Sequence, residues 1–413
     1  MKALVLAGGF PQIALLEELK SRGVATVLAD WNREPVAKKY ADKFYQASTL
    51  DEKRIEEIAI AEKVDFVITV CTDQALLTVA KVSEKLGLPC YIDSRTALNV
   101  TNKTYMKNVF VRNGIPTAKF LILQEISEEA VSGLDYPIIV KPADCNSSKG
   151  VRRVENYAEL KKAFEDASRI SRTRSVIIEE FITGNELSAD FYISNGKAVL
   201  LSVSESRKIA DHDKFVIFRA IYPPASSCGL LEKIKDIGQK IADAFNITDA
   251  PMLVQMLANG GNVNVIEFSA RTGGGVKYLL IRHISGFDVI KSVVDLTMGI
   301  RPACNVGKAR TKYLVNDFIY CKPGVYDHLV NFEELKNNGD MTDYYVFKWK
   351  GAQFDSISNS GDRVAGYTVT ADSLDELITR HNAIRKSIRV EDADGNDIAR
   401  HDLLTDLDRE DFQ

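Results

Sequence analysis

The sequence predicts an α/β protein in which an N-terminal parallel sheet domain is followed by parts of mixed, α+β character. Strand and helix patterns alternate through residues 1–93, and this alternation is typical of parallel strands wrapped by helices. Farther along, Asn195-Gly196 and Asn259-Gly260-Gly261 each separate two strand-like runs, which indicates antiparallel hairpins. A chain of 413 residues is also too long for one hydrophobic core, so we expect two or three domains.

The composition excludes several classes of protein. With 45% apolar and 27% charged residues, it is ordinary for a soluble globular protein. The formal net charge of −4 argues against a general nucleic-acid partner, because phosphate backbones require a concentrated excess of Lys and Arg. No segment approaches the roughly 18 consecutive apolar residues of a membrane span, and the apolar start at residues 1–9 is too short for a signal peptide. We therefore expect a cytoplasmic protein with no nucleic-acid and no membrane partner.

The cysteines and histidines form no recognisable metal or disulfide pattern. The six cysteines are scattered without a C-x-x-C pair, which fits reduced thiols rather than a disulfide framework or a zinc site. Only five histidines occur, none with the H-E-x-x-H spacing of a zinc protease. No protein nucleophile is expected, since a catalytic thiol needs a basic partner and the sequence suggests none beside Cys145.

The first 93 residues account for the parallel sheet. Gly8-Gly9 follows the first strand, but the dinucleotide fingerprint G-x-G-x-x-G is absent. We therefore interpret the two glycines as a tight turn from strand to helix. Strands are expected at residues 3–7, 26–29, 66–70 and 90–92, and helices at 13–19, 55–61 and 76–86.

The first domain boundary is expected near residue 101. Helix-start and amphipathic signals run through residues 93–111 and include Asn102–Lys107. The sequence Gly114-Ile115-Pro116-Thr117 then breaks the helix and leads into an extended run at residues 119–123.

The stretch Tyr136–Val151 is the strongest local candidate for a binding site. Its β-branched run Ile138–Val140 reads as a buried strand, and Lys141 ends that strand. The small, polar segment that follows allows backbone N–H groups to approach an anion, while Ser147, Ser148 and Lys149 add hydroxyl and ammonium donors. This is phosphate-binding chemistry. The alternative interpretation is a solvated turn with a lysine that extends its charge into water.

The remainder of the chain predicts further strands and helices around that stretch. Residues 176–186 look like a buried strand that passes into a hinge, since three apolar residues lead into paired acids, an aromatic residue and a glycine. Residues 269–275 end in three glycines and open a helical pattern. From about residue 306 the pattern is mixed. Helices are expected at 158–167, 230–245 and 372–388, and strands at 187–194, 197–204, 252–258, 263–268 and 363–370.

Four short motifs together resemble those of the ATP-grasp superfamily. The resemblance is to the branch that includes the large subunit of carbamoyl-phosphate synthetase, biotin carboxylase and the carboxylate–amine ligases, and it covers nearly the whole chain. It implies a pre-ATP-grasp α/β domain at 1–101, an ATP-grasp domain at 102–305 with a nucleotide-clamping subdomain at about 118–185, and a C-terminal α+β domain at 306–413. The motifs are Asn102–Lys107 with Gly114–Thr117, Val140–Pro142 with Ser147–Val151, Glu179–Ile182 with Gly184 and Glu186, and Glu267-x-Ser269-x-Arg271 followed by glycines.

The resemblance implies an ATP site. Lys103 and Lys141 are similar to the two lysines that reach the nucleotide phosphates from opposite sides, and Lys149 would form part of a lid over them. Glu180 and Ile182 match the hinge residues whose backbone reads the adenine edge. The residues implied to bind ATP are Lys103, Lys141, Ser147, Ser148, Lys149, Gly150, Val151, Glu179, Glu180, Phe181, Ile182 and Glu186.

The same resemblance implies catalytic, substrate and metal residues. Arg271 would face the transferring phosphoryl group together with Lys141 and Lys149 as catalytic residues. Gln255 and Ser269 depart from the family pattern, which commonly has an acid and an asparagine at these two positions, and this weakens the metal site without removing it. The substrate residues are Arg271, Gly273, Gly274 and Lys277, and the metal ligands are Gln255, Glu267 and Ser269.

The activity that the resemblance implies is an ATP- and Mg²⁺-dependent carboxylate–amine ligation through an acyl-phosphate, with Mn²⁺ as an alternative metal. Activation by ATP is needed because a carboxylate is a poor electrophile, and enclosure protects the acyl-phosphate from water. The partners would be a small-molecule carboxylate and an amine, and a homodimer is compatible with the sequence. Two alternatives stay open: a phosphotransferase that stops after phosphorylating a small acceptor, and a nucleotide-binding regulatory protein without turnover.

Overall fold

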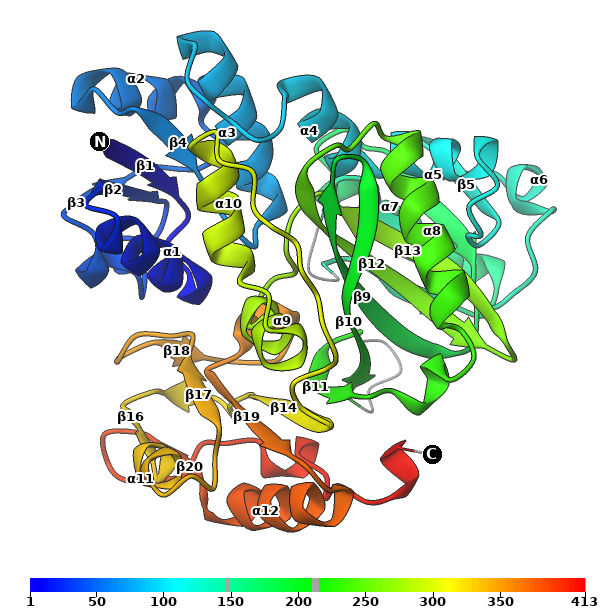
Figure 1. Ribbon diagram of the computed structural model, residues 1–413. Coiled ribbons are helices and arrows are strands. Elements are labelled where there is room, and N and C mark those ends of the chain that lie inside the picture. Colours follow the sequence, from blue (N-terminus) through cyan, green and yellow to red (C-terminus); the bar gives the residue numbers. More distant parts are fainter. Residues whose placement is uncertain (146–148, 210–214, 413) are drawn as a thin grey trace.

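A computed structural model describes residues 1–145, 149–209 and 215–412. It is a mixed α/β structure built around three main sheets, and the expected fold class is confirmed (Figure 1). The first sheet (blue) is parallel, as the alternating pattern at the N-terminus predicts. Ser147 and Ser148 of the expected phosphate loop lie outside the described residues.

The N-terminal sheet has the strand order β3-β2-β1-β4. The strands β1 and β2 are almost wholly buried because helices cover the sheet. Gly8 is required by a close approach, since a Cβ atom there would lie 2.6 Å from Pro35 Cβ. The elements are β1 (Lys2–Leu6), α1 (Phe10–Ser21), β2 (Ala25–Asp30), β3 (Lys43–Gln46), α2 (Glu52–Glu62), β4 (Phe66–Ile68) and α3 (Asp73–Leu86).

In the N-terminal region, one expected strand does not form, and one strand that was not expected does. Residues 90–92 are a loop, and their apolar side chains pack against neighbouring hydrophobic clusters; a three-residue apolar run has the same pattern in both cases. The edge strand β3 has no apolar run from which a strand could be predicted. The helical region near residue 102 is two helices, α4 (Ser94–Thr101) and α5 (Lys103–Arg112), because the Asn102 side chain accepts a hydrogen bond from the Tyr105 amide and begins a new helix.

A four-stranded antiparallel sheet with the order β5-β8-β6-β7 follows. In its centre, β6 and β8 are paired through five residues each, so that Lys141 and Glu179 lie on neighbouring strands. The elements are β5 (Phe120–Leu123), α6 (Glu128–Val131), β6 (Ile138–Pro142), β7 (Arg152–Val154), α7 (Tyr157–Ile170) and β8 (Val176–Glu180).

The largest sheet has eight antiparallel strands in the order β13-β12-β9-β10-β11-β14-β19-β17. Four of its strands are the two hairpins expected from the glycine turns, and the sheet continues without a break into the C-terminal region (Figure 1). The strands are β9 (Asn185–Ser194), β10 (Lys197–Lys208), β11 (Ile217–Tyr222), β12 (Ala250–Asn259), β13 (Asn262–Ser269), β14 (Tyr313–Ile319), β17 (Asp343–Val346) and β19 (Ala365–Ala371).

Helices and two small ladders complete the structure. The helix α8 packs on β10 and α12 packs on β19, whereas α10 packs against α1 of the N-terminal domain. Among the described residues, no helix combines the length and the apolar character that crossing a membrane requires. The remaining elements are α8 (Leu231–Ala244), α9 (Lys277–Ser285), α10 (Val289–Thr297), β15 (Gly324–Val325), β16 (His328–Val330), α11 (Phe332–Asn337), β18 (Gln353–Phe354), α12 (Leu374–Ser387) and β20 (Arg389–Glu391).

Candidate active site

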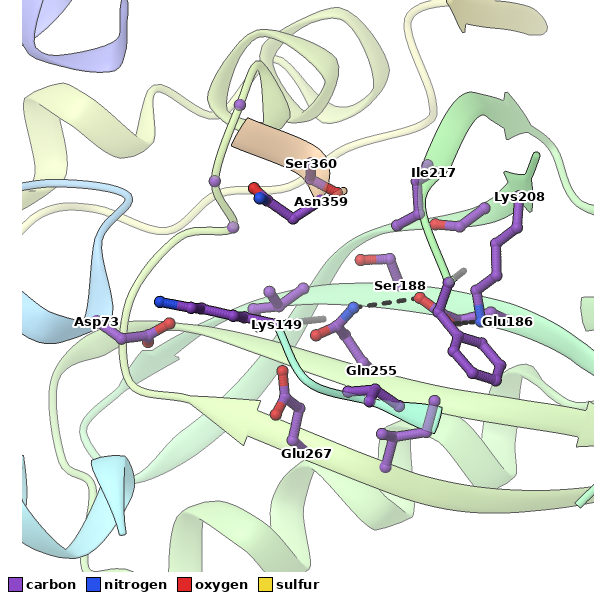
Figure 2. Close-up of a pocket in the computed structure, with 18 of the residues that line it drawn as sticks. Asp73, Lys149, Glu186, Ser188, Lys208, Ile217, Gln255, Glu267, Asn359 and Ser360 are labelled. Carbon is purple, nitrogen blue, oxygen red and sulfur yellow. Dashed lines mark hydrogen bonds and ion pairs between the residues drawn. The ribbon is translucent and has the colours of Figure 1, made fainter. Parts of the chain in front are cut away.

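A cavity of about 1160 Å³ lies where the three main sheets meet. Its lining comes from every part of the chain: the turns that follow β1 and β4, the four-stranded sheet, the floor formed by β9, β12 and β13, and the short helical turn Ser360–Asp362. Figure 2 shows Gln255 and Glu267 on the floor strands, with Asn359 and Ser360 on the opposite side of the cavity. Among the described residues, eight Lys or Arg side chains and five Asp or Glu side chains line it. The cavity is thus positive in a protein whose net charge is −4.

Lys141 lies at the end of β6 and forms an ion pair with Glu179 of β8. The other carboxylate oxygen of Glu179 lies 2.8 Å from Nζ of Lys107, a buried residue of α5. Burial would raise the pKa of Glu179, but the charges of the two lysines outweigh burial and lower it to about 2. Glu179 therefore stays ionised and holds two cationic side chains at the cavity wall.

Lys103 and Glu267 form a second ion pair, with 2.7 Å between Nζ and Oε2. Lys103 is the first residue of α5, so the Asn102 cap fixes where its side chain starts. Glu267 lies directly opposite Gln255 in the β12–β13 ladder, and opposite residues of an antiparallel pair project from the same face. Burial would raise the pKa of Glu267, but the nearby charge of Lys103 outweighs it and keeps the pKa below its usual value. Two oxygen-bearing side chains thus face the cavity together.

Glu186 of β9 lies next to Gln255 on the floor. Its Oε1 accepts a hydrogen bond of 3.2 Å from Gln255 Nε2, and its Oε2 lies 2.6 Å from Lys208 Nζ. Figure 2 shows Glu186 between Gln255 and Lys208. Each Glu186 oxygen thus has one partner already and keeps a second lone pair that can accept a further hydrogen bond.

The segment after β8 has the open backbone groups expected of a hinge. The Phe181 amide donates to the Pro137 carbonyl over 3.1 Å, whereas the Ile182 amide has no acceptor among the described residues. The guanidinium of Arg153 stacks on the Phe181 ring at 4.5 Å. Glu180, Phe181 and Ile182 all line the cavity, so a planar ring could bind here between apolar side chains and a free amide.

Arg271 is bound by Asp73, a residue that the sequence analysis did not identify. Arg271 Nε lies 2.7 Å from Asp73 Oδ1, and its Nη2 donates to Oδ2 of the same carboxylate. Ser269 also donates to Asp73, so this expected metal ligand faces a carboxylate in the structure. Burial would raise the pKa of Asp73, but the charge and hydrogen bonds of Arg271 outweigh it and hold the pKa below the usual value. Asp73 therefore fixes the plane of the guanidinium.

Gly273 and Gly274 lie between Arg271 and the first turn of α9, and both line the cavity. Lys277 begins α9 and donates to Ser204 Oγ over 2.5 Å, with Asp190 Oδ2 at 3.8 Å. Burial, only partly offset by the charge of Asp190, lowers the pKa of Lys277. This lysine thus lines the cavity while it contacts β9 and β10.

The described part of the expected phosphate loop lies at the cavity edge. Lys149 is exposed and forms no ion pair with the described residues, and Val151 follows it in the lining. Gly150 has a φ of 74°, and a Cβ atom there would lie 3.0 Å from Pro142 Cγ, so both its conformation and its surroundings favour glycine.

Several lining residues could not be assigned to the site from the sequence alone. Lys107 belongs to a helix motif that was recognised, but its burial beside Glu179 could not be inferred. Asp73 reads only as an acidic residue in the first turn of a helix. Lys208, Asn359, Ser360 and Arg363 carry no motif of their own.

Comparison with known proteins finds similarity to one domain family over part of the chain. A model described as "ATP-grasp domain" matches residues 134–278. The chain is 25% identical over 290 residues to the carbamoyl phosphate synthase arginine-specific large chain of Bacillus subtilis, a match that covers 68% of this chain and 27% of that protein. It is 32% identical over 209 residues to a D-alanine–D-alanine ligase of Azobacteroides pseudotrichonymphae, which covers 49% of this chain and 61% of the relative. The chain thus spans only about a quarter of the synthase large chain.

Solved structures share the fold over almost the whole chain. The L-amino acid ligase of Bacillus licheniformis superposes with a TM-score of 0.77 and 19% identity, covering 94% of this chain and 98% of that one. The phosphoribosylglycinamide synthetase of Anaerococcus prevotii gives a TM-score of 0.74 and 20% identity, covering 94% and 99%. The chain therefore contains an ATP-grasp domain, with homologues among the carbamoyl-phosphate synthase large chains and the D-alanine–D-alanine ligases.

Proposed function

We propose that this protein is an ATP- and Mg²⁺-dependent ligase that joins a small-molecule carboxylate to an amine through an acyl-phosphate. The observation that carries the proposal is the positive cavity in which Lys103, Lys141 and Arg271 converge on a floor that presents Gln255 and Glu267. An excess of cations over a pair of oxygen ligands suits a polyphosphate with a divalent metal ion. The relatives named as ligases support the same activity.

In this proposal the nucleotide lies between the four-stranded sheet and the floor. Its adenine binds at Glu180–Ile182, where the Ile182 amide is available, and its ribose lies near Glu186. Lys103 and Lys141 neutralise phosphate oxygens from two sides, and Lys149 and Gly150 cover them. Lys107 is added to the expected set as a positioning residue, because it shares Glu179 with Lys141 and so fixes the direction of that side chain.

The residues present fit magnesium. Gln255 and Glu267 lie opposite each other on neighbouring strands and offer one amide oxygen and one carboxylate. The described residues contain no group of three or more His, Cys, Asp or Glu that could hold a metal ion. One amide oxygen and one carboxylate suit an ion that takes one or two protein ligands and completes its coordination with phosphate oxygens and water. Bound there, Mg²⁺ supplies a positive charge that polarises the phosphates.

The chemistry proceeds in two balanced steps. First, an oxygen of the substrate carboxylate attacks the γ-phosphorus of ATP, the bond from that phosphorus to the β–γ bridging oxygen breaks, and ADP leaves. Arg271, held flat by Asp73, faces the transferring group and offsets its negative charge. Second, the amine attacks the acyl carbon, phosphate leaves, and the amine loses a proton to give the amide. Enclosure of the site keeps water from the acyl-phosphate.

A trapping experiment tests the proposal. ADP release is measured for pairs from a panel of carboxylates and amines, and hydroxylamine then replaces the amine. We expect ADP release to require a carboxylate, and the trapped product to be its hydroxamate by mass spectrometry. A phosphorylated acceptor that accumulates as the end product, with no amide or hydroxamate, would instead show the phosphotransferase. ATP binding without ADP release for any pair would support the regulatory protein.

The division into domains at 1–101, 102–305 and 306–413, with the clamping subdomain at about 118–185, is part of the same proposal. The four-stranded sheet falls within 118–185, and the parallel sheet within 1–101. Limited proteolysis followed by mass spectrometry of the fragments checks these boundaries, with early cleavage expected near residues 101–118 and 305.

A further inference from the structure

The cavity lining includes an arginine, Arg363, to which the proposed nucleotide site assigns no role. Of the eight Lys and Arg side chains that line the cavity, six form ion pairs with carboxylates of the described residues. The two without such a pair are Lys149, which the proposed function assigns to the phosphates, and Arg363. Arg363 therefore contributes to the cavity lining a positive charge that has no carboxylate partner among the described residues.

The contacts of Arg363 hold its guanidinium in place without neutralising it. Its Nε donates to Tyr320 Oη over 3.1 Å, and its Nη2 donates to the Ile217 carbonyl over 3.3 Å. The guanidinium also stacks on the Phe318 ring at 3.6 Å from the ring centroid. All three partners are uncharged. Nη1 has no acceptor among the described residues and lies 3.3 Å from the place where a Cβ of Gly275 would stand.

The surroundings of Arg363 are apolar and aromatic. Phe10, Phe318 and Phe347 all line the cavity, with ring centroids 5.7 Å apart for Phe10 and Phe347 and 6.1 Å apart for Phe318 and Phe347. We call these three rings and Arg363 the distal wall. A single fixed guanidinium beside aromatic rings suits a ligand with one negative charge and a ring-sized apolar body. A phosphate dianion carries two negative charges, and a single guanidinium would neutralise only one of them.

The distal wall is within reach of the reacting atoms. Gly275, next to Arg363 Nη1, follows Arg271 by four residues, so the Cα atoms of Arg271 and Gly275 are at most about 14 Å apart. A small molecule can therefore place its reacting group at Arg271 and a second group at Arg363.

We propose that one organic substrate of this ligase has a carboxylate remote from the new bond, bound by Arg363, and an apolar ring-sized body packed on Phe10, Phe318 and Phe347. This inference rests on the proposed function for the identity of the site, but its test measures binding rather than turnover. The substrate class is thus an aromatic or bulky apolar acid, and Arg363 selects it by charge.

Calorimetric titration of the full chain with matched probes tests this inference. The probes are benzoate, 3-phenylpropanoate and 4-phenylbutanoate, each compared with its primary amide, with ADP and Mg²⁺ present and again without nucleotide. We expect at least one acid to bind, and its amide to bind at least tenfold more weakly. Arg363→Gln should raise the Kd of that acid at least tenfold and change the Kd of the amide less than threefold. Arg363→Lys, which keeps the charge but not the planar fork, should lie between.

Controls separate this inference from folding and from the proposed function. Arg389→Gln removes an exposed arginine of β20 and should leave every Kd within twofold. An unchanged Kd for ADP shows that Arg363→Gln is folded, and the comparison of acid with amide on the unaltered chain needs no variant at all. The inference is overturned if no acid binds, if acid and amide bind equally, or if Arg363→Gln weakens both alike. Loss of ADP binding in the unaltered chain would count against the nucleotide site alone, since the titrations without nucleotide still report on Arg363.

Discussion

Arg271 donates to Asp73 through both Nε and Nη2, and this contact joins residues that lie 198 positions apart in the chain. Asp73 is the first residue of α3 and follows the parallel strand β4, whereas Arg271 follows the antiparallel strand β13. The carboxyl end of a parallel sheet is a common place for binding residues. Here it supplies a carboxylate that orients an arginine of a different sheet.

The first prediction concerns this contact. Asp73→Asn should lower kcat roughly 100-fold, the effect expected from displacing a catalytic group by about 1 Å, because the amide cannot hold both guanidinium nitrogens. The Kd of ADP should change little, because Asp73 acts through Arg271, and Arg271 is proposed to face the γ-phosphoryl group that ADP lacks. Steady-state kinetics and calorimetry check both quantities. Asp236→Asn, which breaks an exposed pair with Lys240 on α8, is the matched control. A fall in ADP affinity equal to the fall in kcat would show that Asp73 supports the fold and not the position of Arg271.

Lys141→Met should strongly reduce turnover while the protein stays folded. Methionine keeps much of the apolar stem, Glu179 retains Lys107 as an ion-pair partner, and only the phosphate-neutralising charge is lost. We expect kcat/KM to fall by about 10²- to 10³-fold, as when one donor to a developing anion is removed. Circular dichroism confirms folding, and the exposed Lys162→Met on α7 should behave as the unaltered protein. Turnover within threefold of the unaltered protein would contradict the role of Lys141.

Gln255→Glu should make the stability of the protein depend on magnesium. Gln255 Nε2 donates to Glu186, so a carboxylate at position 255 would face two neighbouring carboxylates, Glu186 and Glu267. Like charges in contact disfavour the folded state unless a cation bridges them. Thermal unfolding should show a lower Tm for the variant without magnesium and recovery with millimolar magnesium. The exposed Gln353→Glu on β18 should show neither effect. Equal Tm values with and without the metal would remove Gln255 from the ligand set.

Asp317 should make the free energy of unfolding depend on pH. Both of its oxygens bind the buried Arg219, and Oδ2 also lies 2.8 Å from His381 Nε2. Burial would raise the pKa of Asp317, but the charges of Arg219 and His381 outweigh burial and hold this pKa well below the ordinary 3.8. A carboxyl group with a lowered pKa contributes stability above its unfolded pKa and loses that contribution as the pH falls toward the folded value. Asp317→Asn should therefore be less stable by about 3–5 kcal/mol at neutral pH, with the difference shrinking below pH 3.8. Urea unfolding of both proteins from pH 7 to pH 3 measures it, and a difference that is constant with pH would contradict the assignment.

The local sequence predicts much of this structure, and the features that it does not predict have a common cause. Lys103, Lys141 and Glu267 could be singled out because each belongs to a short motif at a recognisable point of a strand or helix. Asp73 and Arg363 could not, since each acquires its position from strands that are distant in the chain and no local pattern encodes that proximity. The expected strand at residues 90–92 fails for a similar reason, because three apolar residues pack equally well in a loop between two cores.

The eight-stranded sheet has a consequence for shortening the chain. The strand β14 pairs with β11 through four residues, so the C-terminal region continues a ladder that begins on the cavity floor. A chain cut after residue 305 would leave β11 with a row of unpaired N–H and C=O groups, the template on which other chains add strands. It would also expose Ala220, Ile221 and their apolar neighbours. The C-terminal quarter is therefore not a detachable module, and a shortened protein would be expected to aggregate rather than to keep a working nucleotide site.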